Sequence, residues 1–210
     1  MIPEVGGSSR SLDRLPSSAA WGDAACICPW LLYLHYGDRT VLAEQFDSMR
    51  KWVDYITGVT ARPGLWISTS DELWSGGHHY GDWLGLDAHA GSYHGASREG
   101  LIAGAFYYVS TSLLVKAGAV LGMALPEYRA LQARIRAAFL QEYPEPKTQT
   151  ECVLMLFFDL TDDPARVGQT LVHLLHENGD RLATGFVGTP YLLHALHKIG
   201  RDDLAYKLLL

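Results

Sequence analysis

Apolar side chains recur at the spacing of a helix face over most of this chain. In residues 23–36 and 40–56 they return every three or four positions, which predicts two α-helices. Pro29 falls within the first pattern and marks either its first turns or a kink. The short Tyr36-Gly37-Asp38 turn between the two stretches predicts an antiparallel helical hairpin.

The same succession of helix, turn and helix continues to the end of the chain. Further helices are predicted over residues 99–121, 126–143, 149–159, 163–178, 190–199 and 202–210. No run of residues alternates as a strand would, so the pattern predicts an all-α fold of helical hairpins. We expect a single domain over 1–210, in which 1–17 is a loop or arm. The last pattern stops at Leu208-Leu209-Leu210, partway through an amphipathic helix, so we expect a segment of a longer protein.

Composition narrows the classes of function. The 210 residues are 48% hydrophobic, enough for one sizeable core, and carry a net charge of −6 with no cluster of Lys or Arg. We therefore expect no nucleic-acid partner. No N-terminal leader and no outstanding apolar window of membrane-spanning length is present, so we expect a cytoplasmic chain with no membrane contact. The three cysteines, Cys26, Cys28 and Cys152, are predicted to be reduced core residues.

A long glycine- and aromatic-rich loop, at about residues 57–100, holds the most suggestive chemistry. It contains Tyr80-Gly81-Asp82-Trp83, in which a carboxylate adjoins an indole. A tryptophan offers a flat apolar face to the C–H side of a sugar ring, and an aspartate accepts hydrogen bonds from its hydroxyls. The pair therefore favours a neutral carbohydrate ligand. Trp66 and Trp74 are weaker candidates for extending such a site toward an aglycone, while Trp30 and Trp52 are expected in the core.

Carboxylates in the loops are the candidates for acid–base work: Asp23, Asp71, Glu72, Asp82 and Asp87. Inverting glycoside hydrolysis needs two carboxyl groups roughly 6.5–9.5 Å apart. We interpret Asp23 and Asp82 as hydrogen-bonding a sugar or fixing loop geometry. Helix capping by Asp23 and an Asx turn at Asp82 are equally open.

Histidines also gather in the long loop, at His78, His79, His89 and His94. No pair has the spacing that makes a zinc site specific, so we expect no metal and interpret them as solvated or hydroxyl-binding residues. Thr148-Gln149 and Thr184-Gly185-Phe186 are predicted to open helices. Their free backbone N–H groups suit either a substrate hydroxyl or a simple cap.

Several motifs follow one another in a specific order. They are Ser18-Ala19-Ala20-Trp21-Gly22-Asp23-Ala24, Pro29-Trp30, Tyr36-Gly37-Asp38, Tyr80-Gly81-Asp82-Trp83-Leu84, Thr148-Gln149-Thr150 and Thr184-Gly185-Phe186-Val187-Gly188-Thr189-Pro190-Tyr191-Leu192. In this order the chain resembles the catalytic domain of bacterial α-L-rhamnosidases, which are six-hairpin glycosidases with an (α/α)6 toroid. The resemblance implies about four of the six hairpins.

The resemblance also implies a reaction and a set of site residues. Family members hydrolyse terminal α-L-rhamnose with inversion and without a cofactor. Their general acid lies in a Cys-Pro-Gln-Arg-Asp-Glu-Arg-type segment upstream and their general base in a Trp-Glu segment downstream, and neither motif occurs in this sequence. We therefore expect no catalytic residue here and no activity from this chain alone. Trp21 and Trp83 match aromatic positions that line the rhamnose pocket in the family, and with them we expect Asp23 and Asp82 to bind the substrate.

Other functions stay open. One is a different six-hairpin carbohydrate-active enzyme, either a glycosidase or a lyase, and another is a non-catalytic helical module that binds sugar or a protein. The expected partner is a rhamnose-containing oligosaccharide or glycoside. Because an incomplete toroid leaves apolar helix faces uncovered, self-association is expected as well.

Overall fold

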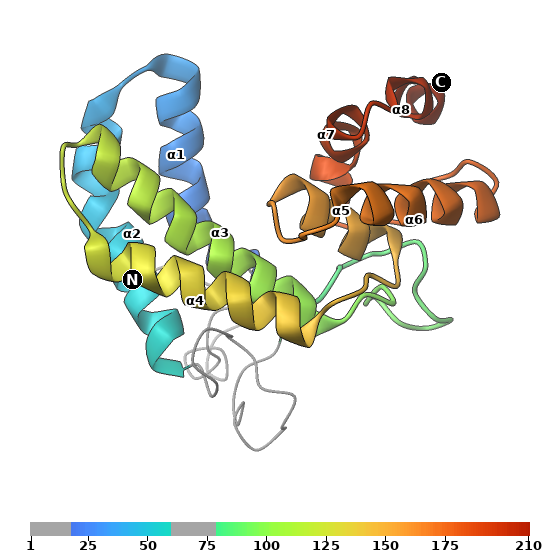
Figure 1. Ribbon diagram of the computed structural model, residues 1–210, viewed down its shortest axis with the longest axis horizontal. Helices are drawn as coiled ribbons and strands as arrows, with labels where there is room; N and C mark the ends of the chain where they lie inside the picture. Colours follow the sequence, from blue (N-terminus) through green and yellow to red (C-terminus); the bar gives the residue numbers. More distant parts are fainter. Residues whose placement is uncertain (1–17, 60–78) are drawn as a thin grey trace. The chain divides into compact units, whose positions relative to one another are not determined.

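The computed structural model describes residues 18–59 and 79–210, and its regular structure is helical (Figure 1). The helices of the described residues are α1 (Ala24–Tyr36), α2 (Arg39–Val59), α3 (Glu99–Val120), α4 (Pro126–Glu142), α5 (Gln149–Phe157), α6 (Pro164–Glu177), α7 (Thr189–Lys198) and α8 (Asp202–Leu209). An isolated β-bridge joins Trp83 and His94. The predicted arm at 1–17 lies outside the described residues, as do the candidates Trp66, Asp71, Glu72, Trp74 and His78.

Local signals place the helix ends close to the predicted ones. Gly37 ends α1 with a φ of +68°, and its N–H donates to the carbonyl of Tyr33 at 2.8 Å. Thr148 begins α5 by accepting a hydrogen bond from the N–H of Glu151 at 3.2 Å. Asp163 caps α6, whose first turn contains proline. The prediction of an all-α fold made of consecutive helices joined by turns and loops is confirmed.

The chain forms two compact units. Of the described residues, the first comprises 18–59 and His79 with Phe106–Ala138, and the second comprises Tyr80–Ala105 with Phe139–Leu210. In the first unit α1 packs against α2, which buries one apolar face, made of Leu42, Met49, Trp52, Val53 and Ile56. Polar contacts connect α2 to the other two helices of this unit. The hydroxyls of Thr57 and Tyr107 lie 2.8 Å apart, and that of Tyr128 donates to Asp54 at 2.7 Å.

Helix α5 is the centre of the second unit. Its residues are buried from Gln149 to Leu156, and it packs against both α6 and α7, while α7 packs against α8. A helix buried on all sides has to satisfy its polar side chains internally. Gln149 does so by accepting a hydrogen bond from the N–H of Ala183 at 2.8 Å, which fixes the start of the loop before α7.

Helix α3 is long and apolar enough to cross a membrane by length and composition, but 78% of that apolar window is buried inside the molecule. It therefore behaves as a core helix. All three cysteines are free thiols. Cys26 and Cys152 are buried as predicted, whereas the prediction is wrong for Cys28, which is exposed on α1. Trp52 is buried as predicted, and Trp30 is only half-buried.

Candidate functional site

Asp23 is the centre of a buried hydrogen-bond cluster in the first unit. Its Oδ1 accepts hydrogen bonds from the indole N–H of Trp52 at 2.8 Å and the hydroxyl of Ser110 at 2.5 Å. Its Oδ2 accepts from the N–H of Ala20 at 2.8 Å. The side chain is fully buried and makes no capping bond to α1, so the capping interpretation is wrong. The geometry is that of a carboxylate fixing the loop before α1 to α2 and α3.

Trp21 lies in this fixed loop, half-buried, immediately before Gly22. A Cβ at Gly22 would overlap the ring of Trp52, so only glycine lets that ring pass close enough to reach Asp23. The Trp21-Gly22-Asp23 motif is therefore a packing unit that presents one indole at a defined place. The role of Trp21 in a sugar pocket stays a prediction.

Asp82 joins two loops and a helix of the second unit. Its Oδ1 accepts the N–H groups of Val187 at 3.0 Å and Gly188 at 3.3 Å. Its Oδ2 accepts the N–H of Gly185 at 2.7 Å and the hydroxyl of Thr150 at 2.5 Å. The side chain is fully buried, so both oxygens are used inside the protein. The Asx-turn interpretation is wrong, because the carboxylate reaches residues more than a hundred positions away.

Glycines in the motifs allow this close approach. A Cβ at Gly185 would lie 2.5 Å from the carbonyl oxygen of Trp83 and 2.6 Å from the nitrogen of Gly85. A Cβ at Gly188 would overlap the side chain of Thr150. The N–H of Phe186 then donates to the carbonyl of Trp83 at 2.7 Å. The three motifs that contain Asp82, Thr150 and Gly185 are therefore one hydrogen-bonded assembly.

The loop that carries Trp83 is also held further along. Asp87 Oδ1 accepts the N–H of Ala96 at 3.0 Å. At the end of the loop Arg98 forms two side-chain hydrogen bonds, at 2.9 and 2.8 Å, with the fully buried carboxylate of Glu151. A bidentate pair of this kind fixes direction as well as distance. The loop is therefore anchored at its beginning, middle and end.

Trp83 belongs to an aromatic cluster on this anchored loop. Its ring stacks on Tyr93 with centroids 5.4 Å apart and an angle of 26°, and it meets Tyr80 and His94 edge to face at 5.6 and 5.3 Å. Trp83 is half-buried, whereas Tyr93 is 64% exposed. The outer ring of the stack is therefore Tyr93, which sequence reasoning missed. The sequence does contain one signal for Tyr93, because an aromatic residue between two glycines, Gly91 and Gly95, indicates a ring carried on a loop.

The histidines of the long loop that the structure describes, His79, His89 and His94, have different surroundings. His79 is buried and its Nδ1 accepts the N–H of Ala19 at 3.1 Å in the first unit. His94 lies 3.7 Å from Glu99, and His89 is exposed. Within residues 18–59 and 79–210 no three His, Cys, Asp or Glu side chains are grouped so that they could hold a metal ion.

Burial raises the pKa of both Asp23 and Asp82, because a charged carboxylate loses its hydration there. Hydrogen bonds from Ser110 to Asp23 and from Thr150 to Asp82 act in the opposite direction. A raised pKa is also a property of general acids. Neither carboxyl has an exposed oxygen, however, from which a proton could reach a leaving group.

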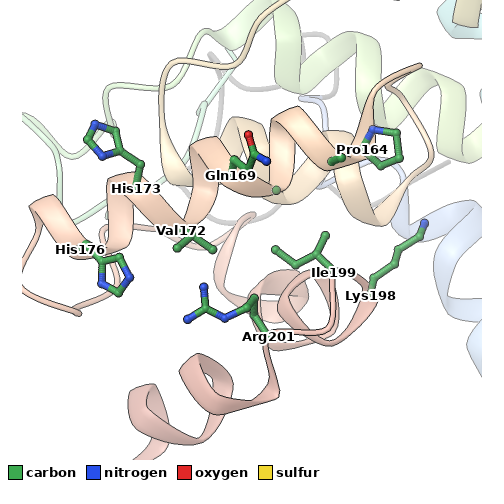
Figure 2. A pocket seen from close by; sticks show the side chains of 10 residues that line it. Pro164, Gln169, Val172, His173, His176, Lys198, Ile199 and Arg201 are labelled. Carbon is green, nitrogen blue, oxygen red and sulfur yellow. The ribbon is translucent and has the colours of Figure 1, made fainter.

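A pocket of about 700 Å³ lies elsewhere in the second unit, between α6 and the end of α7 (Figure 2). Its wall is formed by Pro164, Ala165, Gly168, Gln169, Val172, His173, His176, Lys198, Ile199 and Arg201. Its lysine and arginine are already paired, Lys198 with Asp159 at 2.5 Å and Arg201 with Asp203 at 2.7 Å. None of the predicted sugar-binding residues lines it, so it is separate from the aromatic cluster.

The described residues thus define a helical-hairpin protein whose loops present anchored aromatic side chains. Comparison with known proteins identifies the family to which the chain belongs. The whole chain, residues 1–210, matches the bacterial alpha-L-rhamnosidase 6 hairpin glycosidase domain, and the chain belongs to that family. The predicted resemblance and fold class are confirmed.

Three matches illustrate the likeness. The chain is 35% identical over 199 residues to an alpha-L-rhamnosidase of Streptomyces avermitilis, covering 91% of this chain and 18% of that protein. The crystal structure of Streptomyces avermitilis alpha-L-rhamnosidase complexed with L-rhamnose matches with a TM-score of 0.79 and 34% identity, over 91% of this chain and 18% of that one. The structure of native alpha-L-rhamnosidase from Aspergillus terreus matches with a TM-score of 0.81 and 30% identity, over 91% and 23%. The chain spans about a fifth of the length of the curated relatives it matches.

Proposed function

We propose that this chain is part of the catalytic domain of an α-L-rhamnosidase that hydrolyses terminal α-L-rhamnose from a glycoside or oligosaccharide. The observation that carries the proposal is the family match along the whole chain. It is supported by a 34% identical relative that was crystallised with L-rhamnose. The aromatic loop around Trp83 fits a neutral sugar, whose C–H face stacks on aromatic rings, because its two carboxylates, Asp82 and Asp87, accept hydrogen bonds from the protein backbone.

In this proposal the predicted sugar-binding residues have two kinds of role. Trp83 contacts the sugar directly, and Tyr93 adds an exposed ring beside it. The contact of Trp21 with sugar stays a prediction. Asp23 and Asp82 act through the residues that they hold in place. Both are fully buried, and their oxygens accept protein hydrogen bonds, so they are positioning residues.

We place the general acid and the general base outside this chain. The buried carboxylates Asp23, Asp82 and Glu151 are all engaged with protein donors, and Asp87 accepts a backbone N–H. A catalytic pair for inversion needs one carboxyl group facing the leaving oxygen and one facing water. Structural carboxylates of this kind supply neither.

Hydrolysis of an aryl α-L-rhamnoside tests this assignment. The polypeptide encoded by the complete reading frame should release rhamnose, and the 210-residue chain should show no turnover. Robust activity of the 210-residue chain that is abolished by Asp82→Asn would overturn the claim that the acid–base pair lies elsewhere. If the polypeptide encoded by the complete reading frame keeps its turnover after Asp82→Asn and loses only stability, the result would support the positioning role of Asp82.

A further inference from the structure

Leu84 has a backbone conformation that leucine rarely adopts. Its φ is +57°, in the left-handed region that favours glycine, yet 56% of its surface is exposed. Its N–H donates to the carbonyl of Tyr93 at 2.6 Å, which helps to hold this conformation. Neither backbone preference nor burial explains a leucine here, and such local conflicts are typical of functional positions.

Further large apolar side chains are exposed on the hydrogen-bonded loops that contain Leu84. Leu86 is 70% exposed, and Tyr93 and Phe186 are each 64% exposed. Phe186 is tied to this loop through the hydrogen bond from its N–H to the carbonyl of Trp83. We call Leu84, Leu86, Tyr93 and Phe186 the apolar platform. Exposed apolar groups gathered in this way mark binding surfaces more often than single exposed leucines do.

The platform is poor in charge. Between residues 80 and 97 the only Asp, Glu, Lys or Arg residues are Asp82 and Asp87, and both carboxylates accept backbone hydrogen bonds. Residues 183–193 contain no charged side chain, although such residues make up 19% of the chain. A neutral ligand fits this surface, whereas a phosphate or a sugar acid would find no countercharge.

The platform is also rigid. The bonds of Asp82, Asp87 and the Arg98–Glu151 pair hold the loop at three places. A surface that is already ordered loses little conformational entropy when a ligand binds, so exposed side chains on it contribute more to affinity.

We infer that the apolar platform binds an uncharged, apolar group joined to the sugar, so that it sets the preference for the leaving group. This inference rests on the proposed function, because Trp83 is the point at which the sugar and the platform meet. The stack of Tyr93 on Trp83 makes the two surfaces continuous. A leaving group that is bound by the platform raises kcat/KM for apolar glycosides relative to small ones.

The test compares phenyl α-L-rhamnoside with methyl α-L-rhamnoside, using the polypeptide encoded by the complete reading frame. The measured quantity is the ratio of kcat/KM for the two substrates, relative to the same ratio in the unaltered protein. Leu84→Gly and Tyr93→Ser should each lower this ratio about tenfold, by removing apolar contact area. Tyr93→Phe should retain the ratio. Tyr206→Ser is the matched control, since Tyr206 is 69% exposed but lies on α8.

Leu84→Gly also shows whether a lowered ratio of kcat/KM could be due to misfolding of the variant. Glycine adopts the left-handed conformation readily, so the melting temperature of this variant should be unchanged or higher while its preference for the phenyl substrate is lost. An unchanged ratio, or equal losses on both substrates, overturns the inference and leaves the proposed function intact. A wild-type protein that cleaves neither rhamnoside overturns both. Should the ratio stay constant while the variants weaken self-association in sedimentation, the platform is a contact between copies and the inference fails.

Discussion

Replacement of Asp82 by asparagine tests the buried assembly of the second unit most sharply. The carboxylate accepts four hydrogen bonds, from Thr150, Gly185, Val187 and Gly188. An asparagine amide has the same shape but offers one oxygen and one NH₂ group. With its oxygen toward Val187 and Gly188, its NH₂ faces the N–H of Gly185, which is then left without an acceptor.

The expected loss follows from this count. One buried, unsatisfied N–H costs about 1–3 kcal/mol. The two bonds that remain become weaker because the acceptor is no longer charged. Removing a buried charge offsets part of this, since burial disfavours the ionised form of Asp82. We therefore expect Asp82→Asn to lower the free energy of unfolding by about 2–3 kcal/mol.

Urea unfolding at neutral pH and amide hydrogen exchange measure the effect. The amides of Gly185, Val187 and Gly188 should exchange faster in the variant, because their acceptor is the altered side chain. Asp87→Asn is the matched control, since an amide oxygen can still accept the single N–H of Ala96, and it should lose less than about 1 kcal/mol. An Asp82→Asn variant as stable as the wild type, with unchanged exchange at these amides, would refute the reasoning.

Three further predictions concern other parts of the molecule. Asp23→Asn should lower the free energy of unfolding by about 1–3 kcal/mol in urea, because its NH₂ donates, so that either the N–H of Ala20 or the indole N–H of Trp52 loses its acceptor; an unchanged midpoint would contradict this. The pKa of Asp180 is lowered by its hydrogen bond from Lys207, so its stabilising effect should be present above about pH 4 and vanish as pH falls through the lowered pKa. Melting temperatures of wild type and Asp180→Asn should therefore differ at pH 7 and converge in acid, and a gap that widens in acid would be inconsistent. Leu34 is exposed on α1, so Leu34→Lys should weaken self-association in sedimentation, a prediction that fails if the wild type is monomeric at high concentration.

The helices could be predicted because their signals are local. Gly37 ends α1, Thr148 begins α5 and Asp163 begins α6, and each signal lies within a few residues of the helix end it determines. The exposure of Cys28 could not be predicted in this way. Helix α1 is apolar on several sides, so the pattern does not say which side the fold covers.

The pairing of motifs could not be predicted from their sequence either. The resemblance rested on the order of the motifs that contain Asp82, Thr150 and Gly185, and nothing local shows that one carboxylate joins them across more than a hundred positions. For the same reason the sequence left three interpretations of Asp82 open, namely a sugar ligand, a residue that fixes loop geometry and a turn residue. Tyr93 was missed because a tyrosine in a glycine-rich loop has no periodic pattern, and its stack on Trp83 joins residues that are ten positions apart.

The stereochemistry of the released sugar tests our proposal that the complete polypeptide hydrolyses an α-L-rhamnoside with inversion. Proton NMR of the polypeptide encoded by the complete reading frame, mixed with an aryl α-L-rhamnoside, shows which anomer of rhamnose forms before mutarotation. An inverting α-L-rhamnosidase releases β-L-rhamnose first, and this is the result we predict. Initial release of the α anomer would contradict inversion, and the absence of any released rhamnose would contradict the proposed function itself.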